Sequence, residues 1–216
     1  MCEVDLKELK AQYEEYIIPE YEAAVRLTKA RIENINKILK KKWGYGLDED
    51  QIKSRTKSFD ATIKKWDRKK YPGDLSIAGI RQYVTDIAGI RIITDFEDEI
   101  YDVVDVLRKV PSINIIEECD YVENKKKSGY QSYHIIAMIE IYSPITEGSK
   151  LVPVEIQIRD WTMDAWARIE HKLKYKKAYN EEDDFFTISA GQLNDFRKSA
   201  VEKKNNLKSS EKNPAE

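Results

Sequence analysis

The chain has 216 residues, of which 35 % are charged and 41 % hydrophobic, and its net charge at neutral pH is −2. This length fits one domain with helical extensions at its ends. The small net charge gives no general case for nucleic-acid binding, so any basic site must be local and not the whole surface.

The location of the protein is expected to be the cytoplasm. Cys2 and Cys119 are too few for a disulfide framework and match no metal-ligand spacing, which fits a reducing cytosol. The N-terminus MCEVDLKELK carries charge where a signal peptide needs an apolar core. No apolar run approaches the ~20 residues of a membrane span.

The first 46 residues are expected to be helical. Two helices, at residues 5–17 and 20–42, or one kinked helix would place Pro19 in a first helical turn, where proline is tolerated. Residues 43–46 should end the helix. Apolar side chains at three- and four-residue steps predict one amphipathic face: Tyr21, Ala24, Val25, Thr28, Ile32, Ile35 and Leu39.

Short elements follow. Residues 52–57 form an extended segment, Ser58 is the expected N-cap of a helix that ends at 71–73, and residues 76–83 form a short helix. The helix after Ser58 should bury three side chains: Phe59, Ile63 and Trp66.

The middle of the chain predicts buried strands around one helix. Strands are expected at residues 86–93, 113–116 and 133–142, and a polar, lysine-rich loop at 120–131. Asp95 should cap a helix whose core-facing residues are Ile100, Val103, Val104 and Leu107. Residues 143–150 turn the chain into the next strand, as in a hairpin.

The run VPVEIQIR, residues 152–159, alternates strictly. One face is wholly aliphatic and must pack on a core, whereas the other face carries Glu155, Gln157 and Arg159 and must lie in a cleft or in water. The polar face is the expected floor of an active site.

Two helices are expected at the C-terminal end, at residues 161–177 and 185–201, and the polar end of the chain is expected to be frayed. The order of elements predicts an α/β fold: a mixed sheet of about five strands, some of them antiparallel, flanked by helices.

Cations gather in the extended segment KSRTKS, where Lys53, Arg55 and Lys57 would share one face. A polyphosphate could bind them with charge-assisted hydrogen bonds, or the segment could be a solvated edge strand on which lysines discourage aggregation. The chain contains neither GxxxxGK[ST] nor GxGxxG, so phosphates would bind through side-chain cations and a metal.

Acidic candidates are Asp86 and Glu155. Asp86 could be a Mg²⁺ ligand beside bound phosphates, with Glu155 as a second carboxylate. Alternatively, Asp86 caps a turn and Arg91 extends to the surface. The Glu170–His171 pair has no HExxH pattern and does not support zinc.

The loop at residues 125–134 combines cations, a glycine and aromatics. It could bind phosphates while Tyr130 stacks on a base, or it could be a flexible basic hairpin. His134 by itself is more typical of a structural strand residue.

Five segments in this order resemble the synthetase domain of the RelA/SpoT family, and most closely its stand-alone small alarmone synthetases. They are KSRTKS (53–58), DIAGIRII (86–93), SGYQSYH (128–134), VEIQIR (154–159) and WARIEHKLKYK (166–176). The resemblance implies a nucleotidyltransferase-like synthetase fold and transfer of pyrophosphate from ATP to the 3′-hydroxyl of GDP or GTP, or of GMP, with Mg²⁺ as cofactor. It also implies a homotetramer built through terminal helices.

The same resemblance implies the roles of single residues. Arg55 and Arg91 would sandwich the adenine of ATP, with Lys57, Lys53 and Ser58 near its phosphates. Asp86 and Glu155 would hold Mg²⁺, and Glu155 would also be the general base. The acceptor nucleotide would contact Tyr130, His134, Gln157, Arg159 and the basic loop that includes Lys127. The three lysines at 125–127 depart from the family's usual proline or asparagine.

Residues 1–46 are then the expected oligomerisation region, 47–178 the synthetase domain and 179–216 a C-terminal helix and tail. The family's hydrolase motif of adjacent His and Asp is missing, because the two histidines, His134 and His171, are not followed by Asp. Two alternatives remain. One is a toxin-type relative that pyrophosphorylates adenosine nucleotides or tRNA 3′ ends. The other is a non-catalytic nucleotide- or RNA-binding tetramer, although RNA is expected at most as a regulator.

Overall fold

The computed structural model describes residues 5–126, 129–143, 145–175 and 184–212. By its internal contacts the chain divides into two compact units. The first comprises Met1–Ile92, Val106–Glu118 and Ile135–Gln157. The second comprises Ile93–Asp105, Cys119–His134 and Ile158–Glu216.

A five-stranded sheet has the order β1-β2-β5-β4-β3. Its strands are β1 (Ile52–Thr56), β2 (Ala88–Thr94), β3 (Asn114–Asp120), β4 (Tyr133–Ser143) and β5 (Gly148–Asp160). β1 pairs with β2 in antiparallel orientation. Only residues 144–147 separate the neighbouring strands β4 and β5, a connection too short for a parallel crossover. The expected mixed sheet flanked by helices is confirmed.

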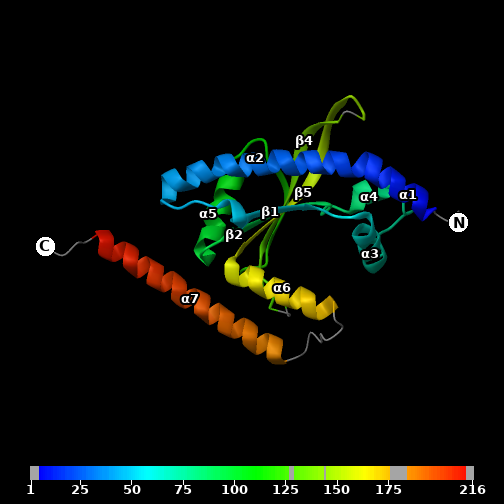
Figure 1. Ribbon diagram of the computed structural model, residues 1–216. Helices are drawn as coiled ribbons and strands as arrows, with labels where there is room; N and C mark the ends of the chain where they lie inside the picture. The colour runs from blue at the N-terminus through cyan, green and yellow to red at the C-terminus, as the bar shows by residue number, and fades with distance from the viewer. Residues whose placement is uncertain (1–4, 127–128, 144, 176–183, 213–216) are drawn as a thin grey trace. The chain divides into compact units, whose positions relative to one another are not determined.

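The N-terminal helices are one nearly continuous rod (Figure 1). α1 (Leu6–Gln12) continues through a π-helical turn, η1 (Tyr13–Ile17), into α2 (Ile18–Trp43), which carries Pro19 in its first turn. Of the two predicted alternatives, the kinked helix is therefore correct. The π-turn places the buried Tyr13 hydroxyl 2.7 Å from the carbonyl oxygen of Lys57, to which it donates a hydrogen bond.

The predicted amphipathic face of α2 is buried along its whole length, and α2 packs against β1. Glu20 is buried on the same helix although it is charged. Its carboxylate accepts hydrogen bonds from Arg81 (2.5 Å), Ser143 (2.8 Å) and Lys150 (2.9 Å). Periodicity alone would place a glutamate outside the core; these three donors explain why Glu20 lies inside it.

Two short helices connect β1 to β2. A 3₁₀ turn, η2 (Glu49–Gln51), precedes β1, and α3 (Phe59–Lys69) and α4 (Ile77–Tyr83) follow it. Ser58 caps α3, as expected, by accepting a hydrogen bond from the backbone N–H of Ala61 at 3.3 Å. The expectation for Ile63 was wrong, because Thr62 takes the buried position and Ile63 is only half-buried. Thr62 is held there by hydrogen bonds to Tyr13 and to the Ser58 carbonyl.

Strand β5 has the predicted aliphatic face, with Val152, Val154, Ile156 and Ile158 almost inaccessible to solvent. α5 (Glu97–Leu107) buries the four residues expected of it. β3 is longer than the predicted strand 113–116 and extends through polar residues to Asp120. Backbone pairing, which does not depend on apolar side chains, accounts for the extra length.

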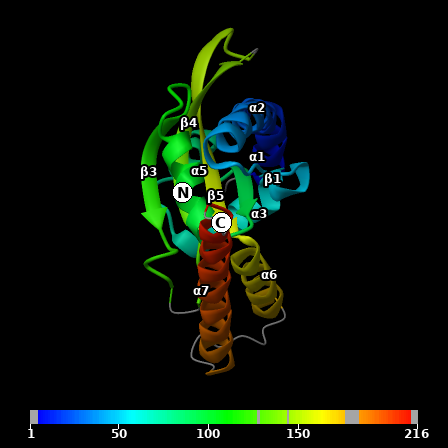
Figure 2. The same ribbon diagram turned by 90° about the vertical axis from the view of Figure 1, so that its left-hand side faces the viewer.

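The second unit ends in a pair of helices, α6 (Trp161–Tyr175) and α7 (Asp184–Lys212), which pack against each other (Figures 1 and 2). The expected frayed end after Val201 was wrong, because α7 stays helical to Lys212. Lys204 explains part of the difference: its Nζ lies 3.1 Å from Asp98 Oδ1 and 2.8 Å from Glu99 Oε1 on α5. Residues 176–183, the expected end of the first of these helices and its connection, lie outside the described residues. Within the described part of the chain, no helix is long and apolar enough to cross a membrane.

Candidate active site

A pocket of about 180 Å³ in the first unit is formed by three neighbouring strands. It brings together side chains from three of the sequence segments singled out above. Its lining residues are Lys53, Ser54 and Arg55 of β1, Gly89, Ile90 and Arg91 of β2, and Glu155 and Gln157 of β5.

The β1–β2 register determines which cations meet in this pocket. Lys53 pairs with Arg91, and Arg55 pairs with Gly89. Residues two apart on a strand share one face, so Lys53, Arg55 and Arg91 project from the same side of the sheet. Two planar guanidinium groups on one face can stack on a flat aromatic ligand such as a base.

Glu155 adds an acid to this cationic pocket. Its Oε2 accepts a hydrogen bond from Gln157 Nε2 at 2.7 Å, and both side chains are half-buried. The amide restricts the rotation of the carboxylate. A fixed carboxylate beside a substrate pocket can accept a proton from a hydroxyl group or bind a metal ion.

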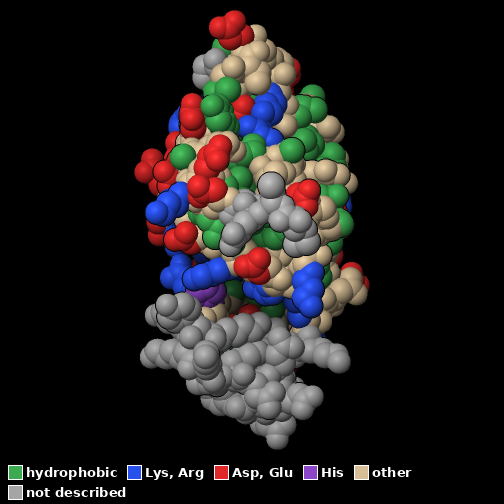
Figure 3. Space-filling model, turned by 90° about the vertical axis from the view of Figure 1, so that its right-hand side faces the viewer, with side chains coloured by type: hydrophobic (Ala, Val, Ile, Leu, Met, Phe, Trp, Pro, Cys, Tyr) green, Lys and Arg blue, Asp and Glu red, His purple; other side chains and the backbone are tan. Residues whose placement is uncertain are grey.

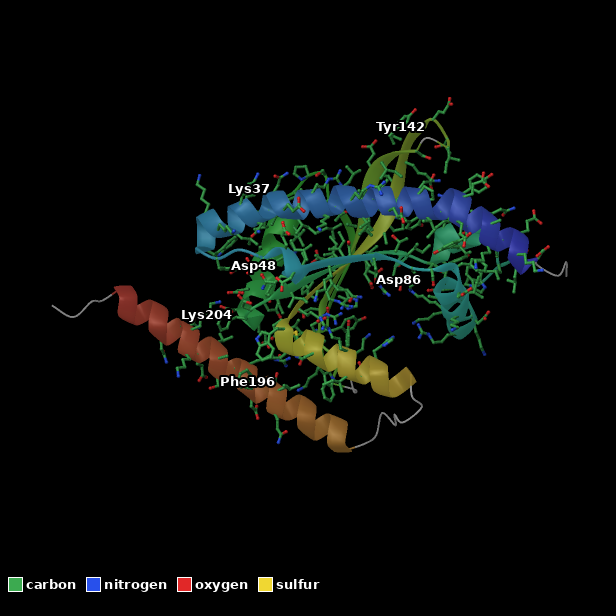
Figure 4. The ribbon with its side chains drawn as sticks, in the orientation of Figure 1. Lys37, Asp48, Asp86, Tyr142, Phe196 and Lys204 are labelled. Carbon is green, nitrogen blue, oxygen red and sulfur yellow. The ribbon has the colours of Figure 1, made fainter. Side chains whose placement is uncertain are left out.

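Asp86 lies in an ionic cluster between α4 and β2 (Figure 4). Lys57 Nζ is 2.6 Å from its Oδ2, and Lys65 Nζ is 2.8 Å from its Oδ1. Burial alone would raise the pKa of Asp86, but the hydrogen bonds and charges of the two lysines outweigh burial and hold the pKa below its ordinary value. Asp86 is therefore an anion at neutral pH.

Burial has the larger effect on Lys57, whose pKa is lowered despite the nearby Asp86 carboxylate. Lys65 also takes part in this cluster, although no sequence motif singled it out. A helix capped at Ser58 puts positions 58, 62 and 65 on one face, so the predicted helix already placed Lys65 beside the KSRTKS segment. Lys57 itself lies beyond the end of β1 and is buried, rather than continuing the row of Lys53 and Arg55.

The second unit brings three of the predicted acceptor residues together. The Tyr130 hydroxyl is 2.9 Å from His134 Nε2 and accepts a hydrogen bond from Arg159 Nη2 at 3.1 Å. Lys126 Nζ lies 5.2 Å from the centre of the Tyr130 ring. Lys127 lies outside the described residues.

The polar face of this strand was expected to lie in a cleft or in water; at Arg159, which is only 2 % exposed, it does not lie in water. Its charge is balanced by Asp164 of α6, with Nη1 and Oδ1 3.6 Å apart, and Asp164 also pairs with Arg168 at 2.6 Å. Asp164 was not singled out from the sequence. Its spacing of five residues from Arg159, across a strand-to-helix junction, gave no periodic signal.

On the face that carries α1, acidic and basic side chains are intermingled (Figure 3).

Known proteins are similar to this chain in both sequence and fold. Residues 54–180 match the model of the region found in RelA/SpoT proteins. GTP pyrophosphokinase YwaC of Bacillus subtilis is 39 % identical over 127 residues, which are 59 % of this chain and 59 % of the relative. GTP pyrophosphokinase YjbM of the same organism is 32 % identical over 176 residues, 78 % of this chain and 76 % of the relative.

Two solved structures agree with these matches. A GTP pyrophosphokinase family protein from Streptococcus pneumoniae superposes with a TM-score of 0.79 at 30 % identity, covering 92 % of this chain and 96 % of the other. Small alarmone synthetase 1 from B. subtilis, bound to its product pppGpp, gives 0.79 at 27 % identity, covering 91 % and 98 %. The chain has the fold of the small alarmone synthetases and belongs to the RelA/SpoT family.

Proposed function

We propose that this protein is a GTP diphosphokinase of the small alarmone synthetase type, which transfers pyrophosphate from ATP to the 3′-hydroxyl of a guanosine nucleotide. The observation that carries the proposal is the pocket that joins Arg55 and Arg91 to Glu155. Relatives named GTP pyrophosphokinases and a neighbour bound to pppGpp support a guanosine acceptor over the toxin-type alternative.

In this proposal ATP binds on the β1–β2 side of the pocket. The guanidinium groups of Arg55 and Arg91 stack on adenine, and Lys53 contacts the phosphates. Lys57 and Lys65, which pair with Asp86 in this structure, would be available to the phosphates if Asp86 held a metal ion instead. Ser58 can donate its hydroxyl proton while its oxygen remains the cap of α3.

Glu155 is the proposed general base. It takes the proton of the acceptor 3′-hydroxyl as that oxygen attacks the β-phosphorus of ATP. A P–O bond forms to the 3′-oxygen, the bond between the β-phosphorus and the α,β-bridging oxygen breaks, and AMP leaves. Gln157 keeps the Glu155 carboxylate oriented through its 2.7 Å hydrogen bond.

The donor set fits Mg²⁺. Asp86 is an anion with lysine partners on both oxygens, and Glu155 offers a second hard oxygen ligand. Mg²⁺ usually takes one or two carboxylates and completes its shell with phosphate oxygens and water. When bound by Asp86 and Glu155, it would neutralise charge on the phosphates.

The acceptor is proposed to contact the second unit. Tyr130 stacks on guanine, and its hydroxyl, fixed by His134 and Arg159, sets the plane of the ring. Lys126 and Lys127 belong to the loop proposed for the acceptor's 5′-phosphates. A homotetramer assembled through residues 1–46, the domain limits at 47–178 and 179–216, and a cytoplasmic location remain predictions.

The test is product identification. The protein with ATP, Mg²⁺ and GTP, GDP or GMP in separate reactions should give AMP and one 3′-pyrophosphorylated product, and omission of Mg²⁺ should stop the reaction. Transfer to an adenosine nucleotide or a tRNA 3′ end, but to none of the three acceptors, would contradict the proposal. ATP binding without transfer by the wild type would support a non-catalytic binder.

A further inference from the structure

Arg197 is a buried arginine on α7 that none of the roles above uses. It is 5 % exposed, and its guanidinium contacts Glu97, Gln131, Asp160 and Thr162, all in the second unit. Arginine is rarely buried unless its charge is paired. The burial of Arg197, on a helix whose other charged side chains are mostly exposed, therefore indicates that its contacts are specific.

Its charge is balanced by two acids. Arg197 Nε lies 3.2 Å from Glu97 Oε2 at the start of α5 and 3.7 Å from Asp160 Oδ2 at the end of β5. Asp160 is itself fixed, because its Oδ1 accepts hydrogen bonds from Thr162 Oγ1 at 2.6 Å and from the backbone N–H of Met163 at 2.8 Å. The guanidinium is oriented by hydrogen bonds that its Nη1 donates to Thr162 Oγ1 at 3.3 Å and its Nη2 donates to Asn194 Oδ1 at 3.1 Å.

The other edge of the guanidinium points at Gln131. Arg197 Nη2 donates a hydrogen bond to Gln131 Oε1, and the amide nitrogen of Gln131 donates to the carbonyl oxygen of Val122 at 2.8 Å. Both ends of this 6 % exposed amide are therefore bound, one by α7 and one by the turn after β3.

Gln131 is the residue after Tyr130. The next residue, Ser132, is also held: its hydroxyl donates to the Ile158 carbonyl at 3.1 Å, and its own carbonyl accepts from the Tyr121 backbone N–H at 3.1 Å. The backbone that leaves Tyr130 is thus fixed by two consecutive buried side chains, of which one depends on Arg197. The Tyr130 ring in turn takes its orientation from its backbone and from the contacts of its hydroxyl with His134 and Arg159.

We propose that Arg197 is a positioning residue for the acceptor nucleotide: through Gln131, it makes the orientation of Tyr130 depend on the docking of α7. The inference rests on the proposed function, because it gives Tyr130 its acceptor role. Without the Arg197 hydrogen bond, Gln131 can rotate, and the Tyr130 backbone samples orientations in which the ring does not lie over the acceptor base. ATP binding, which uses β1 and β2, does not depend on this contact.

Lys204 provides a matched control. It also fastens α7, but through Asp98 and Glu99 of α5. Lys204→Met and Arg197→Met both remove one cation that holds α7, and only the second removes the donor to Gln131.

The experiment measures KM for GDP and for ATP separately, with kcat and thermal unfolding, for wild type, Arg197→Met, Arg197→Lys, Gln131→Met, Lys204→Met and the Arg197→Met/Gln131→Met double variant. Arg197→Met and Gln131→Met should raise the acceptor KM about tenfold, as expected for loss of a charged hydrogen bond, with the ATP KM unchanged. Arg197→Lys should restore part of the loss, and the double variant should be no worse than Gln131→Met alone.

Equal shifts in Arg197→Met and Lys204→Met, equal rises of both KM values, or additive effects in the double variant would overturn the proposal. If Arg197→Met fails to fold, Arg197→Lys and Gln131→Met still test the proposal. Lysine keeps the positive charge of Arg197, and methionine keeps the approximate size of Gln131. No transfer by the wild type would contradict the proposed function itself, whereas an active wild type with undifferentiated variants would contradict only the role of Arg197.

Discussion

Arg55 of β1 lies directly opposite Gly89 of β2 in the antiparallel ladder. A Cβ built on Gly89 would meet Arg55 Cγ and Nε at 3.5 Å, an ordinary van der Waals contact. The stem of Arg55 therefore lies over Gly89 of the neighbouring strand. Alanine would fit at position 89, whereas a larger side chain would occupy the space of the arginine.

Replacing Arg55 with methionine should raise the KM for ATP about tenfold, because the flexible stem remains but the stacking cation is lost. The acceptor KM should change little. Steady-state kinetics with each substrate varied in turn measures both constants. Arg68→Met, at an exposed position on α3, is the matched control; an identical effect there would mean that general charge loss, not stacking, is responsible.

Glu155→Gln should lower kcat by about 10²–10⁴-fold, since the amide cannot accept the 3′-hydroxyl proton. The fold should persist, because the new amide still fits beside Gln157. AMP release measured by chromatography gives the rate, and titration with a fluorescent ATP analogue checks binding. Glu140→Gln, an exposed glutamate on β4, serves as the control; near-normal turnover by Glu155→Gln would remove the general base from the mechanism.

Asp86→Asn should raise the Mg²⁺ concentration required for half-maximal activity, because the variant loses the formal charge that attracts the cation. It should also leave Lys57 and Lys65 without their anion. Activity measured across a Mg²⁺ titration tests the first effect. An unchanged Mg²⁺ dependence would assign Asp86 to the ionic cluster alone.

Glu20 should govern part of the acid stability of the protein. Burial would raise the pKa of its carboxyl, but hydrogen bonds from Lys150, Arg81 and Ser143 outweigh burial and lower the pKa. A lowered folded-state pKa means that the stabilisation is present above the unfolded-state pKa and is lost as the pH falls through the folded-state pKa. The loss should therefore occur below about pH 4.5, the ordinary value for this carboxyl.

Glu20→Gln should destabilise the protein at pH 7 by about 1–3 kcal/mol, because it leaves the two cations without their acceptor charge. In the same variant, the free energy of unfolding should fall less steeply below pH 5 than it does in the wild type. Urea unfolding followed by circular dichroism at several pH values measures both effects. Glu22→Gln, on the exposed side of the same helix, should change neither; a parallel pH profile for both variants would refute the role of Glu20.

Alternating and helical periodicities predicted the sheet, the buried faces of α2 and β5 and the cap at Ser58, because these depend on local spacing. The resemblance to RelA/SpoT proteins added which residues to examine, and β1, β2 and β5 bring Lys53, Arg55, Arg91, Glu155 and Gln157 into one pocket.

Sequence patterns could not predict the contacts between polar side chains that lie far apart along the chain. The burial of Glu20 depends on Ser143 and Lys150, more than 120 positions further along the chain. Likewise, Arg197 binds Gln131 across 66 positions. Neither contact follows a helical or strand period, and each charge looks solvent-exposed until its partners are known.

The position of β5 in the sheet has a dynamic consequence. β5 is bonded on both sides, by β2 and β4, whereas β1 is an edge strand bonded only to β2. Amide hydrogens around Glu155 should therefore exchange with solvent near the rate of global unfolding, and those of β1 through smaller local openings. The strand that carries Arg55 should therefore open locally more often than the strand that carries Glu155.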